Sequence, residues 1–102
     1  MERGLHNITS ATTTTLLSKG EDAGFLSSIR ITNAHETRAI FIGLYLDDGT
    51  NQTYFFKKYY LNAGETKFLN EGVNFDNSSL SLKLITSVVA SNTGINVNVI
   101  IK

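Results

Sequence analysis

The residues of this sequence that could take part in catalysis are not spaced for it. Nucleophilic catalysis needs a base beside the nucleophile, and the only histidines are His6 and His35. His6 lies in an N-terminal segment that we expect outside the fold, and His35 lies in a predicted turn over residues 34–37. The sequence has no cysteine and no G-x-S-x-G elbow. We therefore predict that the protein is not an enzyme, and no catalytic residue is assigned.

Neighbouring carboxylates occur twice, at residues 21–22 and at Asp47-Asp48. Adjacent side chains of a strand point to opposite faces, so neither pair forms an acid/base couple. Asp48 precedes Gly49, and Asp-Gly is typical of a tight hairpin turn. The alternative is a calcium site formed by Asp47, Asp48 and Asn51, because calcium binds oxygen ligands. No complete ligand loop is visible, so we predict no metal and no cofactor.

Residues 54–60 form the most unusual segment, with five of the ten aromatic residues of the chain. If side chains alternate strictly along a strand, one face carries Tyr54, Phe56, Lys58 and Tyr60. The other face carries Phe55, Lys57, Tyr59 and Leu61. Aromatic residues then occupy both faces, although a sandwich strand needs only one apolar face.

Three interpretations of this segment remain open. The first is a core strand whose outer aromatic rings pack under a loop or beside a lysine stem. The second is a protein interface, because aromatic residues are enriched in buried interface patches. The third is a platform on which nucleic-acid bases stack, although the sequence shows no other basic cluster. Under the second interpretation, the predicted anchors are Tyr54, Phe56, Tyr59 and Tyr60.

Composition favours one small β domain. The chain has 102 residues, 41% of them hydrophobic, with nine basic and nine acidic side chains. A neutral chain lacks the basic excess typical of nucleic-acid or membrane binding, so we expect neither partner. The longest apolar run, residues 39–42, is far shorter than the ~20 residues of a membrane helix. The first residues lack the apolar region of a signal peptide, which favours folding in a cytoplasm.

Alternating apolar and polar residues recur along almost the whole chain and predict short strands. Turn residues separate them, notably Asp48-Gly49, residues 62–64 and residues 91–94. The expected strands cover residues 11–17, 25–33, 40–47, 52–61, 66–69, 80–84 and 95–101. This spacing predicts an all-β protein, a single antiparallel β-sandwich of about seven or eight strands, Ig-like or jelly-roll-like.

The two ends of the chain are expected to differ from the middle. We predict a flexible N-terminal arm over residues 1–10 and a β-sandwich domain over residues 11–102. The last strand, residues 95–101, is either paired inside a sheet or able to extend the sheet of another subunit. The Thr-rich run at residues 12–15 is a similar candidate.

The order of these elements resembles small β-sandwich virion proteins of tailed phages. The similarity covers roughly residues 9–101 as a diffuse series of strands and turns. The segments that carry it are TTTTLL at 12–17, SIRITN at 28–33, LYLDDG at 44–49, NAGETKFL at 62–69, SLSL at 79–82 and INVNV at 95–99. Such proteins often have a proline before the Ala-Gly-Glu-Thr turn, where this chain has Leu61-Asn62.

The resemblance implies a structural role, as a capsid decoration protein or a neck or tail component, and it supplies no catalytic residues. The expected function is a non-enzymatic phage virion protein that decorates or cements the capsid through protein–protein contacts. The alternatives are a neck, tail or fibre component, or a β-sandwich module that binds carbohydrate or a receptor. The expected partners are the major capsid protein or tail and neck proteins, and further copies of the chain in a homo-oligomer. The expected location is the virion, assembled in the host cytoplasm.

Overall fold

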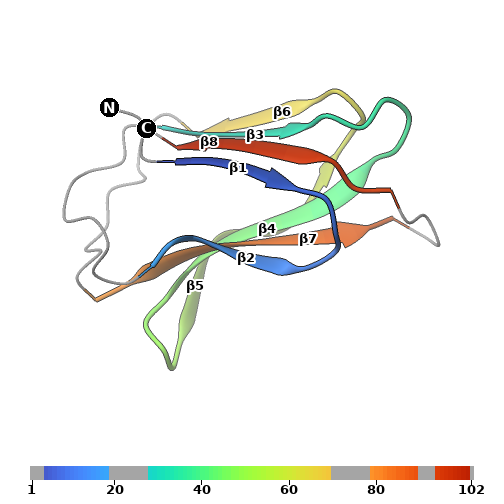
Figure 1. Cartoon of the computed structure of the whole chain (residues 1–102). Coiled ribbons are helices and arrows are strands. Elements are labelled where there is room, and N and C mark those ends of the chain that lie inside the picture. The colour runs from blue at the N-terminus through green and yellow to red at the C-terminus, as the bar shows by residue number, and fades with distance from the viewer. Residues whose placement is uncertain (1–3, 19–27, 70–78, 90–93, 102) are drawn as a thin grey trace.

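The computed structural model describes residues 4–18, 28–69, 79–89 and 94–101. These residues form eight strands that pack as two layers (Figure 1). The strands are β1 (Gly4–Ile8), β2 (Thr13–Leu17), β3 (Ile29–Asn33), β4 (Ile40–Asp47), β5 (Gln52–Leu61), β6 (Thr66–Leu69), β7 (Ser81–Val88) and β8 (Val97–Ile101).

Each layer is a four-stranded sheet, with strand orders β1-β8-β3-β6 and β2-β7-β4-β5, and every neighbouring pair is antiparallel. Only β4 and β5 follow one another within a sheet; the other connections cross between the layers. Eight strands wound in this way form a jelly roll, one of the two arrangements expected from the sequence. The prediction of an all-β sandwich is confirmed.

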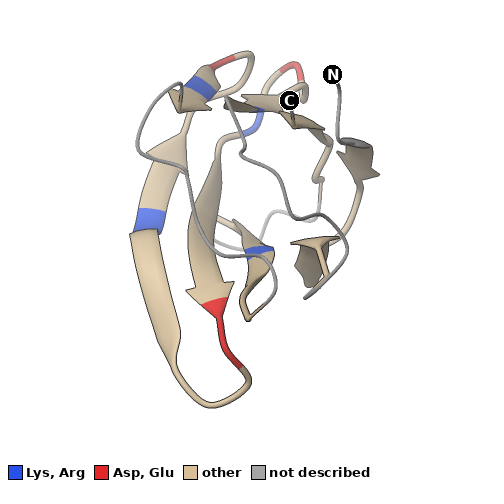
Figure 2. Cartoon of the chain, turned by 90° about the vertical axis from the view of Figure 1, so that its left-hand side faces the viewer, with Lys and Arg blue, Asp and Glu red and all other residues tan. Residues whose placement is uncertain are grey.

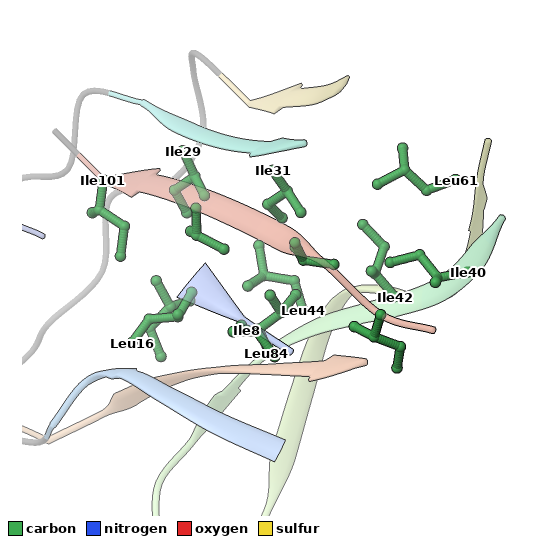
Figure 3. Close-up of a cluster of buried hydrophobic side chains, with 14 of the residues drawn as sticks. Ile8, Leu16, Ile29, Ile31, Ile40, Ile42, Leu44, Leu61, Leu84 and Ile101 are labelled. Carbon is green, nitrogen blue, oxygen red and sulfur yellow. The ribbon is translucent and has the colours of Figure 1, made fainter. Parts of the chain in front are cut away.

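The core lies between the two sheets and consists of aliphatic side chains from alternate strand positions. On β3 and β8 the burial alternates residue by residue, as expected for strands with one face toward the core. Figure 3 shows side chains of both sheets meeting in one cluster. Those less than 2% exposed are Ile29, Ile31, Ile40, Ile42, Leu44, Leu61, Leu82, Leu84, Val97, Val99 and Ile101.

The N-terminal segment differs from the expected arm. Residues Gly4–Ile8 form β1, which pairs along its whole length with β8, and the side chain of Ile8 is buried in the core. Ile8 faces the core, which explains why this segment joins the sandwich. The residues around Ile8 are mostly polar, so the sequence alone does not indicate a strand here. Residues 4–8 therefore belong to the sandwich, and β8 lies inside its sheet between β1 and β3.

Two turns with left-handed glycines lie where the sequence predicts them. Gly49, with φ 97°, belongs to the β4–β5 connection, and Gly64, with φ 77°, to the β5–β6 connection. The first connection spans residues 48–51 and is held by Asp48, whose Oδ1 accepts hydrogen bonds from the backbone N–H groups of Thr50 and Asn51. Asp48 is therefore a turn residue, as predicted.

Candidate protein-binding face

The aromatic segment lies on β5, at the edge of its sheet, and its register against β4 is irregular. Ile42 is opposite Tyr59, but Leu44 is opposite Phe56 and Tyr45 is opposite Tyr54. From Ile42 to Leu44, β4 advances by two residues while β5 advances by three, and from Leu44 to Tyr45 β4 advances by one while β5 advances by two. β5 therefore contains two extra residues in this stretch, each of which forms a bulge. Strict alternation along β5, which the sequence analysis assumed, is therefore wrong.

Gly43 explains how β5 can take this path. A Cβ atom at Gly43 would lie 2.5 Å from the backbone oxygen of Lys57, so any side chain would collide with the bulged strand. A glycine inside a strand is often the sign of a bulge or of a close backbone approach. This signal was present in the sequence, where Gly43 interrupts an otherwise regular alternation.

The irregular register places Tyr54 and Tyr60 on the outer face of the sheet, away from the core. Tyr60 lies opposite Phe41, with ring centroids 5.6 Å apart in an edge-to-face arrangement, and Tyr54 packs on Tyr45 at 5.1 Å. We call Phe41, Tyr45, Tyr54 and Tyr60 the outer aromatic layer. Aromatic pairs of this geometry contribute about 0.5–1.5 kcal/mol beyond the area that they bury.

Two lysines of β5 border the outer aromatic layer. The Nζ of Lys58 lies 4.5 Å from the ring centroid of Phe41, and the Nζ of Lys57 lies 5.6 Å from that of Tyr54. These basic residues lie in the middle of the long β5 strand (Figure 2). The layer is thus bordered by positive charge on the side of β5.

Phe56 and Tyr59, the other two predicted anchors, lie on the opposite face of β5. They are half-buried, pack against the core cluster and contact each other at 5.8 Å. Lys67 of β6, in the other sheet, places its Nζ 4.7 Å from the Tyr59 ring centroid and 5.9 Å from that of Phe56. These two rings therefore close the core at the open side of the sandwich, between β5 and β6.

The sequence analysis did not identify Phe41 and Tyr45 as part of this face. Both lie on the face of β4 opposite to the buried Ile40, Ile42 and Leu44. Tyr45 is only 4% exposed because the Tyr54 ring covers it, whereas Tyr60 is 49% exposed and is the most accessible member of the layer.

The end of the β4–β5 hairpin is ordered by charged groups. Lys83 of β7 donates a hydrogen bond of 2.8 Å from Nζ to Oδ2 of Asp47, whose Oδ1 accepts from the backbone N–H of Gly49. The Lys83 hydrogen bond, followed by that of Gly49, lowers the pKa of Asp47 below its ordinary value. The N–H groups of Asn51 and Thr50 lower the pKa of Asp48 in the same way. The carboxylates that a calcium ion would need are therefore already engaged with protein donors.

The histidines have structural positions. Nδ1 of His35 accepts hydrogen bonds from the backbone N–H groups of Thr37 and Arg38, both at 3.2 Å, which shapes the β3–β4 turn. His6 lies on β1 opposite Val99. In the ranges that the structure describes, no three His, Cys, Asp or Glu side chains are grouped as a metal site. No helix among those residues is long and apolar enough to cross a membrane.

A shallow hollow lies on the other sheet, apart from the outer aromatic layer. It has a volume of about 370 Å³ and is lined by Leu5, His6, Asn7, Asn98, Val99 and Ile100 of β1 and β8. Nearby, Nδ2 of Asn7 donates to Oδ1 of Asn98 at 2.6 Å and of Asn96 at 3.0 Å.

Comparison with known proteins gives structural similarity only. The chain matches no protein-family model and no curated protein sequence. A chain in the structure of infectious bursal disease virus, Gx strain, is similar with a TM-score of 0.46 and 12% identity, covering 99% of this chain and 27% of the viral chain. For the Gt strain the TM-score is 0.43 and the identity 12%, covering 100% of this chain and 25% of the viral one.

This chain thus spans about a quarter of the length of those viral chains. At such values the similarity is distant and concerns the β-sandwich fold alone. Neither of the two structures is of a phage, so the phage-specific expectation rests on the sequence resemblance.

Proposed function

We propose that this chain is a non-enzymatic structural protein of a virion, which attaches to a protein lattice through the outer aromatic layer of β4 and β5. The observation that carries the proposal is the arrangement of Phe41, Tyr54 and Tyr60 on a solvent-facing side of the sheet. Interfaces are enriched in Tyr and Phe at their centre and have polar residues at their rim. Here Lys57 and Lys58 take the place of such rim residues.

The packing of the core favours binding of a partner at the outer surface of the sandwich rather than binding of a ligand between the two sheets. The space between the sheets is filled by aliphatic side chains, many of them with no exposed surface. Binding in the described part of the molecule therefore uses outer faces and strand edges. An outer sheet face suits a protein surface better than a small molecule, which binds in concave sites.

The jelly-roll topology is compatible with this role but does not select it, because the fold serves viral capsid and lectin domains alike. The finer proposal is that of the sequence resemblance: the chain decorates or cements the capsid of a tailed phage, with a place in the neck, tail or fibre as the alternative. Many copies on one particle would bind together even if each contact were weak, because attachment at one point raises the effective concentration at the next.

The experiment that tests this function is co-sedimentation of the purified chain with purified virions from the same source, combined with a glycan array. The proposal expects stoichiometric binding to virions and no glycan binding. Binding to defined glycans without association with virions would contradict it and would identify a carbohydrate-binding module.

A further inference from the structure

Three of the four edge strands carry features that oppose pairing with another chain. Natural sheets protect exposed edges with bulges, short strands, charged side chains and inward-pointing charges. β5 has the two register irregularities and the pair Lys57-Lys58. β6 has four residues, and its Lys67 lies opposite the buried Ile31, facing the interior. β2 has an irregularity between Thr15 and Leu17.

The fourth edge strand, β1, has none of these features. It pairs with β8 in continuous register over all five residues, and among the described strands β8 is its only partner in the sheet. Residues 4–18 contain no Lys, Arg, Asp or Glu, and neither does β8. The charged residues in Figure 2 lie on other strands and turns. A second β1 can therefore approach without repulsion between charges.

The outer face beside this edge is apolar as well. Leu5, on β1, is 66% exposed and is the most exposed large hydrophobic residue of the described chain. Leu5 begins a row of paired residues that crosses the sheet. The row continues through Ile100 on β8 and Arg30 on β3 to Phe68 on β6, at the far edge. Leu5 and Phe68 thus occupy equivalent places in one row across the sheet, one at each edge.

We propose that two copies of this chain join through β1 in antiparallel pairing and form a continuous eight-stranded sheet. A five-residue strand pairs with its copy over its whole length only when the two-fold axis passes midway between the two copies of its central residue, His6. In this register Leu5 lies opposite the partner's Asn7 and Gly4 opposite the partner's Ile8, so that core-facing positions of both copies stay on the core side. The interface is isologous, the commonest form of closed oligomer.

This dimer is independent of the proposed attachment face, because β1 belongs to the other sheet. Loss of virion binding leaves the dimer untouched, and loss of the dimer leaves the outer aromatic layer intact. The two proposals can therefore fail separately.

The first test is the mass in solution, measured by light scattering across a dilution series, of the wild type, Leu5→Lys and Phe68→Lys. A lysine on an edge strand opposes pairing, so Leu5→Lys should weaken the dimer at least about tenfold. Phe68→Lys places the same charge at the equivalent position of the opposite edge and should leave the dimer unchanged. Wild-type protein that stays monomeric at all concentrations, or equal effects of both variants, would overturn the proposal.

The second test uses the absence of native cysteine. In His6→Cys the two introduced thiols would lie directly opposite each other across the new pairing, at a Cα separation of about 4.5–5.5 Å, which suits a disulfide. Mild oxidation should give a covalent dimer on a non-reducing gel, whereas Phe68→Cys should remain monomeric on that gel. Equal cross-linking of the two variants, or none of His6→Cys, would contradict pairing through β1.

Discussion

Asn33 is a fully buried polar residue whose side chain joins three parts of the fold. Its Nδ2 donates to the backbone oxygen of Arg38 at 2.7 Å and to that of Leu61 at 3.2 Å, while its Oδ1 accepts from the N–H of His35. Asn33 therefore fixes the β3–β4 turn and the end of β5. Tyr60 of the outer aromatic layer lies at this end of β5. The sequence showed only an asparagine at a strand end, because its partners are distant backbone groups.

Asn33→Asp should destabilise the protein strongly although the side chains have the same shape. The aspartate removes both Nδ2 donors and places a carboxylate against two carbonyl oxygens, and an unsatisfied buried group costs about 1–3 kcal/mol, more if charged. We expect the free energy of unfolding in urea to fall by at least about 2 kcal/mol. Thr32→Ser, at the neighbouring, outward-facing position of β3, is the control and should change it little. A loss below 0.5 kcal/mol, roughly the size of a surface effect, would show that Asn33 is not needed.

The Asp47–Lys83 pair predicts a pH dependence of stability. The pKa of Asp47 is lowered from 3.8 in the folded state, so its contribution is present above that value and is lost as the pH falls through the lower folded pKa. The pKa of Lys83 is raised from 10.5 by Asp47, so its contribution is present below that value and is lost at higher pH. The pair therefore stabilises the fold between these two limits.

Asp47→Asn should lower the melting temperature in this middle range, and the difference from wild type should narrow at both extremes. The Asn side chain can still accept the N–H of Gly49, so the variant removes the charge pair more than the turn. Thermal unfolding followed by circular dichroism from pH 3 to pH 11 measures the effect. A difference independent of pH would show that the pair contributes nothing through its charges.

At the scale of the element, the hairpin of β4 and β5 decides where the aromatic side chains point. Gly43→Ala would bring a Cβ to 2.5 Å from the Lys57 backbone oxygen, and backbone cannot yield cheaply. We expect a loss of about 1–3 kcal/mol in unfolding free energy, the range for overpacking. A fall in fluorescence anisotropy of the tyrosines should accompany it. Ser87→Ala, on the same face of the neighbouring β7, should be neutral, and equal stability of the two variants would contradict the role assigned to Gly43.

The bounds of strands that have turn residues on both sides were predictable to the residue, whereas the faces of the irregular strand β5 were not. Residues 40–47, 52–61 and 66–69 match β4, β5 and β6 because turn residues bound them on both sides. β1 was assigned to an arm because only Ile8 signals a buried face. The faces of β5 could not be predicted, because two extra residues change which side chains point outward, and the sequence shows only the glycine that permits them.

At the scale of the whole molecule, charge and aromatic residues are distributed unevenly over the jelly roll. Strands β5 and β6 carry Lys57, Lys58 and Lys67, whereas the described residues 4–18, which include β1 and β2, contain no Lys, Arg, Asp or Glu. Although the net charge is zero, these two regions of the surface differ: one carries lysines and the other is uncharged. In the proposed account one of them attaches the protein to a lattice, and the other joins two copies.

The measurement that tests the central claim most directly is virion co-sedimentation of two matched variants, Tyr60→Ser and Phe68→Ser. Both residues are exposed to a similar degree, 49% and 45%, but they lie on the outer faces of opposite sheets. We expect Tyr60→Ser to lower the bound fraction at least about tenfold, as for an aromatic hot spot, while the variant stays folded with a melting temperature reduced by the loss of the Phe41 ring contact. Phe68→Ser should bind like the wild type. Wild-type binding by Tyr60→Ser would contradict attachment through the outer aromatic layer.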